Sequence, residues 1–271
     1  MNNDLRAFLH DDHCDLGPNM DRLHELITPM KNSRFMDLGV RLGPSSAIMS
    51  VDAAAKNNKV HGCDVWWDGF EQNGARFVNK DYMCYLADSV TLGKTWDEDP
   101  FDVIFVDTLH TREFVLAELY YWVNHIKEGG YFVFHDTHLE KYHNPPNPPG
   151  DYVIGGRAWA TPDEAVTDFF GMPSELCDGP LHESITVGEY EDDDVEIKHY
   201  TPSFGMTFVK VKQLDAIERF KSRIDWKDVF EQRNWLVDLH LNKERSDCLG
   251  REGNFDLDNI QMELVINPGD A

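Results

Sequence analysis

Acidic and histidine residues stand at two places where their types could bind a metal or move a proton. Asp107 closes the apolar run 101–106, and the tetrapeptide HDTH follows a second apolar run at residues 135–138. Two histidines and a carboxylate can bind iron in a facial triad, so one chemistry open to HDTH is that of a non-haem iron hydroxylase. Asp107 is a stronger candidate for ligand binding, because open parallel sheets bind ligands at the carboxyl ends of their strands.

A third place where the residues point to a ligand is the segment FMDLGVRLGPSSA at residues 35–47. Gly39 and Gly43 would let a nucleotide-like ligand approach the backbone, and glycine accepts turn conformations that other residues avoid. Asp37 can accept hydrogen bonds from a cationic group. The spacing of the glycines matches neither the dinucleotide fingerprint nor the P-loop, so both of these nucleotide classes are disfavoured.

Two polar positions after predicted strands extend this candidate site. Asp64 lies in the short run 60–65, and a carboxylate about 20 residues beyond a glycine turn can hold ribose hydroxyls. Val65 and Trp66 follow it directly, and an indole could cover an adenine face. The pair Asp88-Ser89, in a predicted loop, could contact the adenine amino group.

Alternating strands and helices must position these residues. The sequence predicts strands at 60–65, 100–107, 131–134, 185–187 and 206–211, and helices at 47–56, 111–127 and 161–170. Ser45 or Ser46 is the expected cap of the first helix, and Gly129-Gly130 is the expected stop of the second. The acidic run 189–196 is expected to be a solvated turn between the last two strands. This alternation predicts an α/β fold.

In their order and spacing, these motifs resemble those of class I S-adenosylmethionine-dependent methyltransferases. The resemblance is to the small-molecule and sugar O-methyltransferases, a group that includes macrolide-sugar methyltransferases and cephalosporin hydroxylase-like proteins. It covers about residues 20–140, through the motifs MDLGVRLGPSSA, HGCDV and FDVIFVDTLHTREFVLAELYYWVNHIKEGGYFVFHD. It implies a Rossmann-like fold with a seven-stranded, mostly parallel sheet, helices on both faces and an antiparallel last strand. The implied reaction is O-methylation of a hydroxyl on a sugar or another small molecule.

The resemblance also implies which residues bind S-adenosyl-L-methionine. It places Asp37, Gly39, Gly43 and Ser46 around the methionine part of the cofactor. It places Asp64 on the ribose with Val65 and Trp66 beside it, Asp88 and Ser89 near adenine, and Asp107 next to the cofactor.

Metal-using members of the group hold magnesium with an aspartate after strand four and two acidic residues after strand five. Asp107 and Asp136 match this pattern, whereas His135 stands where a carboxylate is usual. The expected metal site is Asp107 and Asp136, with His135 as the third ligand, for Mg²⁺ or another divalent metal. His135 replaces one of the oxygen ligands that magnesium prefers. In the same group a histidine three positions after the first aspartate is the base, which makes His110 the expected catalytic base beside Asp107, with His138 in reserve.

Two alternatives to methyl transfer stay open from the sequence. The iron hydroxylase is disfavoured, because such oxygenases are usually built on all-β barrels and this chain alternates strands with helices. A non-catalytic cofactor-binding domain would bind the cofactor without transferring its methyl group.

Composition narrows the class of partner. The 271 residues include 25 lysines and arginines against 49 acids, a formal charge of −24 at pH 7. Binding to nucleic acids depends on cations that neutralise phosphates, so we expect a small-molecule or glycan acceptor instead. Five scattered cysteines without metal spacing indicate reduced thiols in a cytoplasm, and no run approaches the length of a membrane span.

The expected organisation is a methyltransferase domain over residues 1–212, with a proline-rich flap insertion at about residues 139–180 that borders the acceptor pocket. Residues 213–271 are expected to form a C-terminal helical extension and tail. This extension is either part of the same domain or an arm for homo-oligomerisation.

Overall fold

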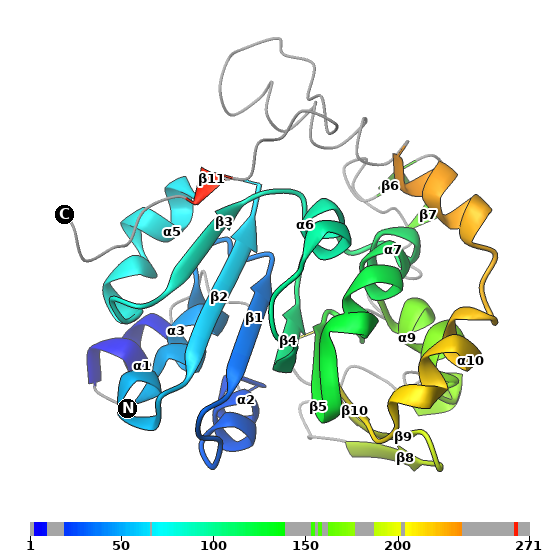
Figure 1. Cartoon of the computed structure of the whole chain (residues 1–271), viewed down its shortest axis with the longest axis horizontal. Coiled ribbons are helices and arrows are strands. Elements are labelled where there is room, and N and C mark those ends of the chain that lie inside the picture. The colour runs from blue at the N-terminus through cyan, green and yellow to red at the C-terminus, as the bar shows by residue number, and fades with distance from the viewer. Residues whose placement is uncertain are drawn as a thin grey trace, which may run out of the picture.

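The computed structural model describes residues 3–9, 19–65, 67–138, 153–154, 157–158, 162–176, 187–201, 204–234 and 263–264. One large sheet with helices on both sides forms the centre of the molecule (Figure 1). Its strands are β1 (Arg34–Leu38), β2 (Lys59–Asp64), β3 (Met83–Leu86), β4 (Phe101–Val106), β5 (Ile126–His135), β8 (Val187–Glu191), β9 (Val195–Tyr200), β10 (Met206–Val211) and β11 (Glu263–Leu264). β6 (Val153–Ile154) and β7 (Arg157–Ala158) form a separate pair.

The helices precede or follow these strands along the chain. They are α1 (Asn3–Leu9), α2 (Asn19–Ile27), α3 (Pro44–Ser50), α4 (Ala53–Lys56), α5 (Asp68–Gln72), α6 (Ser89–Thr95), α7 (Arg112–Trp122), α9 (Pro162–Phe170) and α10 (Ile217–Lys221). Short 3₁₀ turns occupy Ala75–Phe77, Val123–His125, Ser174–Leu176 and Leu214–Ala216, and residues 226–234 are helical. Among the helices described, none is long and apolar enough to cross a membrane.

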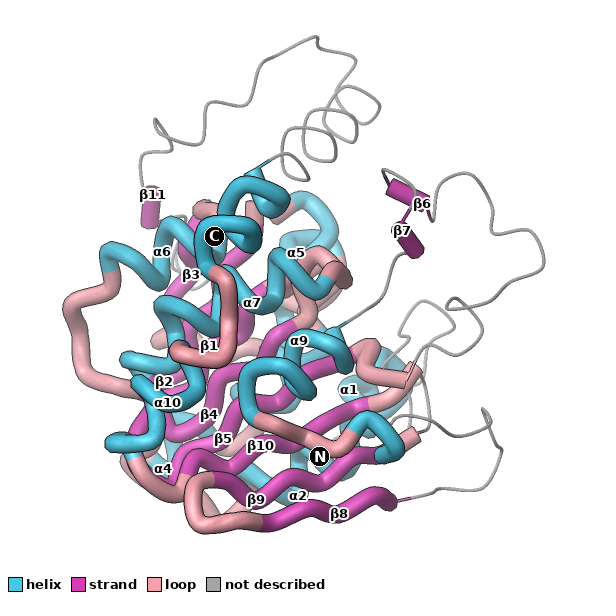
Figure 2. The backbone as a smooth tube through the Cα atoms, turned by 90° about the vertical axis from the view of Figure 1, so that its right-hand side faces the viewer, coloured by secondary structure: helices cyan, strands magenta, loops and turns pink. Residues whose placement is uncertain are grey.

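Five parallel strands form the middle of the sheet, in the order β3-β2-β1-β4-β5. Their carboxyl ends therefore lie along one edge, where ligands bind in open parallel sheets. β11 adds antiparallel to β3, while β10, β9 and β8 extend the sheet antiparallel beyond β5 (Figure 2). The Rossmann-like α/β fold that the sequence predicted is confirmed, with nine strands in the described sheet instead of seven.

The sheet is longer than predicted because the acidic run 189–196 is not a solvated turn. Most of this run lies in β8 and β9, and only residues 192–194 form the turn between them. Lysine side chains offset the acids: Lys198 of β9 lies 3.8 Å from Glu189 of β8, and Lys210 of β10 lies 3.8 Å from Glu196 of β9. Charge compensation across the strands therefore lets an acidic sequence form a β-hairpin.

Two apolar clusters cover the two faces of the sheet. On one face, side chains of β1, β4, β5, β9 and β10 pack against α6, α7, α9 and α10. On the other face, a second set of side chains packs against α1, α2 and α3. The fold is thus three layers deep, and successive residues of β1 and β4 are buried because helices cover both faces of the sheet.

Two predicted helices have other bounds than the sequence indicated. The expected helix 47–56 is divided into α3 and α4, and α3 begins with Pro44 after Gly43 rather than at a serine cap. The expected helix 111–127 ends at Trp122, and β5 starts at Ile126 because Ile126 already pairs with Phe101 of β4. The Gly129-Gly130 pair lies within β5 at the register shift between β4 and β5, so it is not a helix stop.

The predicted domain boundaries fall partly outside the described residues. Of the flap at about 139–180, the structure describes β6, β7, α9 and residues 171–176. Of residues 235–271, it describes only β11. Within residues 213–234, Phe220 and Val229 are buried in the same cluster as α7 and α9. This part of the C-terminal extension is therefore packed on the sheet domain.

Candidate functional site

The loops after β1 and β4 touch at Gly39, which brings two predicted site segments together. Gly39 has a φ of 87°, and a Cβ atom placed on it would lie 2.1 Å from the carbonyl oxygen of Asp107. The amide of Asp107 donates to the carbonyl oxygen of Leu38 at 2.9 Å, and this bond fixes the approach. Gly39 is required for this contact between loops, whereas the sequence predicts a contact of this glycine with the ligand.

Gly43 also takes a left-handed conformation, with a φ of 86°. A Cβ atom there would meet the ring of Phe70 at 2.5 Å, so this glycine makes room for α5 against the start of α3. In both cases the structure shows a packing reason for glycine, and the predicted contacts with the cofactor remain predictions.

Asp37 is fully buried beneath the glycine turn. Ser45 donates a hydrogen bond to its Oδ2 at 2.7 Å, and Ser46 donates to the same oxygen. The predicted capping role of the two serines is therefore wrong, since their hydroxyl protons bind Asp37. Burial raises the pKa of Asp37 to about 7. The two hydrogen bonds from the serines lower this pKa, whereas the negative charges of Asp107 and Asp64 raise it.

Tyr82 extends this buried group of hydroxyls. Its hydroxyl lies 2.6 Å from that of Ser46. Because Ser46 has one hydroxyl proton and gives it to Asp37, Tyr82 must donate to Ser46. The tyrosine reaches this position across Gly62, where a Cβ atom would lie 1.8 Å from the hydroxyl oxygen.

Asp64 ends β2 and faces the same glycine turn. Its Oδ2 accepts a hydrogen bond of 2.7 Å from the backbone amide of Arg41, which has a φ of 49°. The carboxylate thus stabilises the strained turn between the two glycines. Gly39, Asp64 and Asp107 come together at one edge of the sheet, as predicted, while the ribose contact of Asp64 stays a prediction. Val65 is half-buried beside it, and Trp66 lies outside the described residues.

Asp88 and Ser89 follow β3 at the same edge, but their side chains have partners within the protein. Oδ2 of Asp88 caps α6 by accepting from the amide and hydroxyl of Thr91, both at 2.8 Å. The hydroxyl of Ser89 donates to the buried carboxyl of Glu118. Both side chains are at most 5% exposed, and their contact with adenine remains a prediction.

Asp107, His110, His135 and Asp136 form a compact charged cluster at the ends of β4 and β5. Nε2 of His110 lies 3.1 Å from Oδ1 of Asp107 and 2.9 Å from Oδ2 of Asp136. Nδ1 of His135 lies 3.3 Å from Oδ1 of Asp107 and 3.4 Å from Oδ1 of Asp136. Each imidazole thus contacts both carboxylates.

The two histidines differ in their access to solvent. The His110 side chain is 28% exposed, whereas that of His135 is 1% exposed. Asp136 has a φ of 57°, so the chain turns sharply after β5 and directs this carboxylate toward His110. His110 is therefore the histidine of the cluster that an incoming ligand can reach.

Electrostatics holds this cluster in its ionised form. Burial alone would lower the pKa of His110, but the carboxylates of Asp136 and Asp107 outweigh it and raise the pKa to about 10. They likewise raise the pKa of His135. Burial opposes ionisation of Asp107, yet His135 and His110 lower its pKa to about 2, and they lower the pKa of Asp136 as well. This ion-paired arrangement favours the protonated form of His110, and its role as catalytic base stays a prediction.

Three groups of the cluster have the donor types of a metal site. One ligand atom each from Asp107, His110 and Asp136 lies within 4.8 Å of the others. Two carboxylates and an imidazole suit divalent metals that accept nitrogen ligands better than they suit Mg²⁺. His135, the predicted third ligand, contacts both carboxylates as well, so its metal role stays a prediction.

His138, the reserve catalytic residue, lies apart from this arrangement in a buried position. Its ring is 1% exposed and packs on the ring of His199, with 5.5 Å between centroids. Its amide donates to the carbonyl oxygen of Phe204 at 2.6 Å. The structure thus gives His138 a packing role between the end of β5 and the β9–β10 connection.

One buried acid that the sequence did not point to, Glu118, binds the loops after β3 and β4. Glu118 of α7 is 1% exposed and accepts from Ser89 and from Thr108, the latter at 2.9 Å. It occupies the apolar stripe of α7 between Val115 and Trp122, and an acid at that spacing could have indicated a buried polar role.

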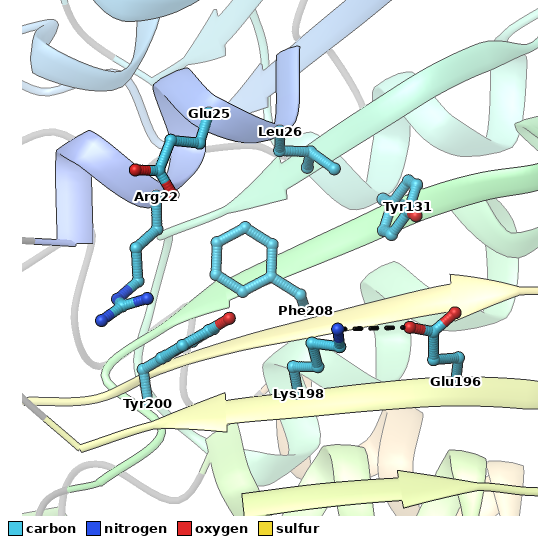
Figure 3. A pocket seen from close by; sticks show the side chains of 8 residues that line it. All are labelled: Arg22, Glu25, Leu26, Tyr131, Glu196, Lys198, Tyr200 and Phe208. Atoms are coloured by element: carbon cyan, nitrogen blue, oxygen red, sulfur yellow. Dashed lines mark ion pairs between the residues drawn. The ribbon is translucent and has the colours of Figure 1, made fainter. Parts of the chain in front are cut away.

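A separate pocket of about 190 Å³ lies on the sheet face beside α2 (Figure 3). Arg22 stacks over the ring of Tyr200 there, 4.0 Å from its centroid. The lining residues are Arg22, Glu25, Leu26, Tyr131, Glu196, Lys198, Tyr200 and Phe208. None of the predicted site residues lines it.

Comparison with known proteins places the chain in a class. Residues 36–137 match a family described as a methyltransferase domain. No curated protein matches the chain significantly. The O-methyltransferase TomG from Streptomyces achromogenes, solved in complex with SAM, is 16% identical and has a TM-score of 0.51, covering 79% of this chain and 91% of its own. The SAH-bound methyltransferase PaMTH1 from Podospora anserina is 12% identical with a TM-score of 0.51, covering 79% and 89%.

The fold, the domain match and the edge that gathers the predicted motifs agree. Residues 36–137 form a methyltransferase domain, and the fold is the one seen in solved SAM-bound O-methyltransferases. For this domain and this fold, the resemblance drawn from the sequence is confirmed. Nothing supports the iron hydroxylase: the sheet is flanked by helices rather than closed as a barrel, and the matching domain is a methyltransferase.

Proposed function

We propose that this enzyme transfers the methyl group of S-adenosyl-L-methionine to a hydroxyl oxygen of a small molecule, with a sugar as the expected acceptor. The observation that carries the proposal is the convergence of Asp107, His110 and Asp136 at the sheet edge that also holds Gly39 and Asp64. Solved proteins of the same fold include an O-methyltransferase in complex with SAM. A charge of −24 favours a small acceptor over a nucleic acid.

Asp37 supports cofactor binding at this edge. Its Oδ1 is buried and has no hydrogen-bond partner within the described part of the chain. A buried carboxylate oxygen without a donor is costly, and a cationic ligand nearby would relieve that cost. S-adenosylmethionine carries positive charge on its sulfonium and ammonium groups, so the raised pKa of Asp37 would fall when the cofactor binds.

The reaction needs alignment and removal of one proton. An oxygen lone pair of the acceptor forms the new C–O bond as the methyl C–S bond breaks, and the hydroxyl proton leaves to a base. His110 is the exposed imidazole of the cluster, but in the ion-paired arrangement it already carries a proton. His110 can serve as the base only in a state where Asp107 and Asp136 are engaged by another positive charge.

The carboxylates of Asp107 and Asp136 are the groups that would hold a divalent cation, because their oxygens lie within 4.8 Å of one another and of the His110 imidazole. When bound, such a cation would supply positive charge that lowers the pKa of the acceptor hydroxyl. The two carboxylates would then face the cation, and the pKa of an imidazole released from them would fall toward its ordinary value.

A labelled-methyl transfer assay tests this proposal. Wild-type protein is incubated with methyl-labelled cofactor and a pool of hydroxylated small molecules, including sugars. We expect labelled product from the wild type, a strong loss with Asp64→Ala through weaker cofactor binding, and a strong loss with His110→Ala while the cofactor still binds. Glu128→Ala is the matched control, since this exposed carboxylate lies at the opposite end of β5. A wild-type protein that neither binds the cofactor nor labels an acceptor would refute the proposal.

Two further proposals concern the location and the assembly of the protein. We infer a cytoplasmic location, in keeping with Cys63 and Cys84, which are buried free thiols. We also infer that the C-terminal segment contributes to a homo-oligomer, and size-exclusion chromatography with light scattering would test this.

A further inference from the structure

The loop after β3 is tied to the C-terminal helical segment by a buried ion pair. A guanidinium nitrogen of Arg233 lies 2.5 Å from Oδ1 of Asp88, and the two side chains are 7% and 1% exposed. The guanidinium also lies over the ring of Phe114 in α7, 5.4 Å from its centroid. Segment 226–234 therefore reaches the edge of the sheet where the cofactor is expected.

The ion pair continues into a network that joins two loops of this edge. Oδ2 of Asp88 caps α6 through Thr91. The next residue, Ser89, donates to Glu118, which also accepts from Thr108 at 2.9 Å. Because Thr108 follows Asp107 directly, the loop after β3 and the loop that carries the charged cluster share one buried carboxyl group.

We propose that Arg233 is a positioning residue for the cofactor, and that it acts through Asp88 to hold the loop after β3 in its binding shape. This inference rests on the proposed function, because that loop is where adenine is expected to bind. A buried carboxylate whose partner is removed is strongly unfavourable. Without Arg233, Asp88 would turn toward solvent, and both the cap of α6 and the bond from Ser89 would shift.

The charges around Glu118 give the proposal a pH signature. Burial, with the charge of Asp88, raises the pKa of Glu118 to about 8, against the hydrogen bonds from Ser89 and Thr108 and the charge of Arg233. The charge of Glu118 also acts on the buried thiol of Cys63 on β2 and helps to raise its pKa. Loss of Arg233 removes the cation of this group, so ionisation of Glu118 between pH 6 and 9 would disturb the loop more in the variant than in the wild type.

The experiment is a double-mutant cycle on cofactor affinity. The dissociation constant of S-adenosylhomocysteine is measured by calorimetry at pH 6, 7.5 and 9 for wild type, Arg233→Met, Arg233→Lys, Asp88→Asn and the double variant Arg233→Met with Asp88→Asn. We expect Arg233→Met to weaken binding by about tenfold at pH 7.5, with a larger loss at pH 9. Arg233→Lys should recover part of the affinity, and the effect of Arg233→Met should largely vanish in the Asp88→Asn background.

A matched control is Arg219→Met, which breaks an exposed ion pair with Asp194 and should leave the affinity unchanged. If Arg233→Met does not fold, Arg233→Lys replaces it in the cycle and is measured in the wild-type and the Asp88→Asn backgrounds. The inference would be overturned if Arg233→Met left the affinity unchanged, or if it weakened binding equally in the wild-type and the Asp88→Asn backgrounds. The proposed function would stand in both cases. If the wild type fails to bind S-adenosylhomocysteine, the proposed function falls and this inference falls with it.

Discussion

Replacing Gly39 by alanine tests whether the contact between the β1 and β4 loops sets the geometry of the site. The left-handed φ of 87° costs a non-glycine residue about 1–2 kcal/mol. The new Cβ atom would lie 2.1 Å from the carbonyl oxygen of Asp107, and overpacking of this kind costs about 1–3 kcal/mol more. We therefore expect the free energy of unfolding to fall by about 2–5 kcal/mol.

The loop carrying Asp107 must also move, by about 1 Å, to relieve this contact, and a shift of that size near reacting groups can cost about 100-fold in rate. Urea denaturation gives the stability change and labelled-methyl transfer gives the rate.

The control is Gly129→Ala, because Gly129 has a similar φ of 75° and a Cβ atom there would meet nothing within 4 Å. It should lose only the conformational part, about 1–2 kcal/mol. Equal destabilisation by the two substitutions, with methyl transfer intact in Gly39→Ala, would refute the close-contact argument.

Three further predictions follow from the buried polar groups. Gly62→Ala should displace the hydroxyl of Tyr82, because a Cβ atom at this position would lie 1.8 Å from it, and should lower the free energy of unfolding by about 1–3 kcal/mol. Adding Tyr82→Phe should restore part of this free energy, and no recovery in urea unfolding would contradict the clash. His110 has a pKa raised to about 10, so its stabilising effect is fully present below pH 6.5 and is lost as pH rises through about 10. In urea unfolding with EDTA, the loss of unfolding free energy caused by His110→Gln should therefore shrink over that window. A loss that stays constant with pH would contradict the ion-pair cluster. Glu118 has a pKa raised from 4.5 to about 8, so the wild type loses stability as pH rises through this range; Glu118→Gln should gain relative to the wild type from pH 5 to pH 9, and a parallel pH dependence would argue that the carboxyl is not buried.

The sequence predicted the functional edge of the sheet because its signals there are local. An apolar run followed by an acid, as in residues 101–107, indicates both a buried strand and its carboxyl end. Asp64, Asp107 and Asp136 all stand at or just past strand ends, so the shared edge followed from the parallel topology. The order of the motifs was enough to identify the class of enzyme.

What the sequence did not predict depends on contacts between distant segments. The hydroxyls of Ser45 and Ser46 bind Asp37 instead of capping a helix, and Pro44 after Gly43 was the local signal for the true helix start. The protonated state of His110 depends on Asp136, which lies beyond the next helix and strand. No pattern near Asp88 could show that its partner would be Arg233.

We propose that the carboxyl edge of the parallel strands binds the adenosyl cofactor. The most direct measurement is a crystal structure of the full chain with S-adenosylhomocysteine. We predict density for the ligand along the turn at Gly39, with its ribose at Asp64 and its sulfur facing the cluster of Asp107 and His110. Density in the pocket beside Arg22 and Tyr200, with that edge closed by side chains, would contradict the account.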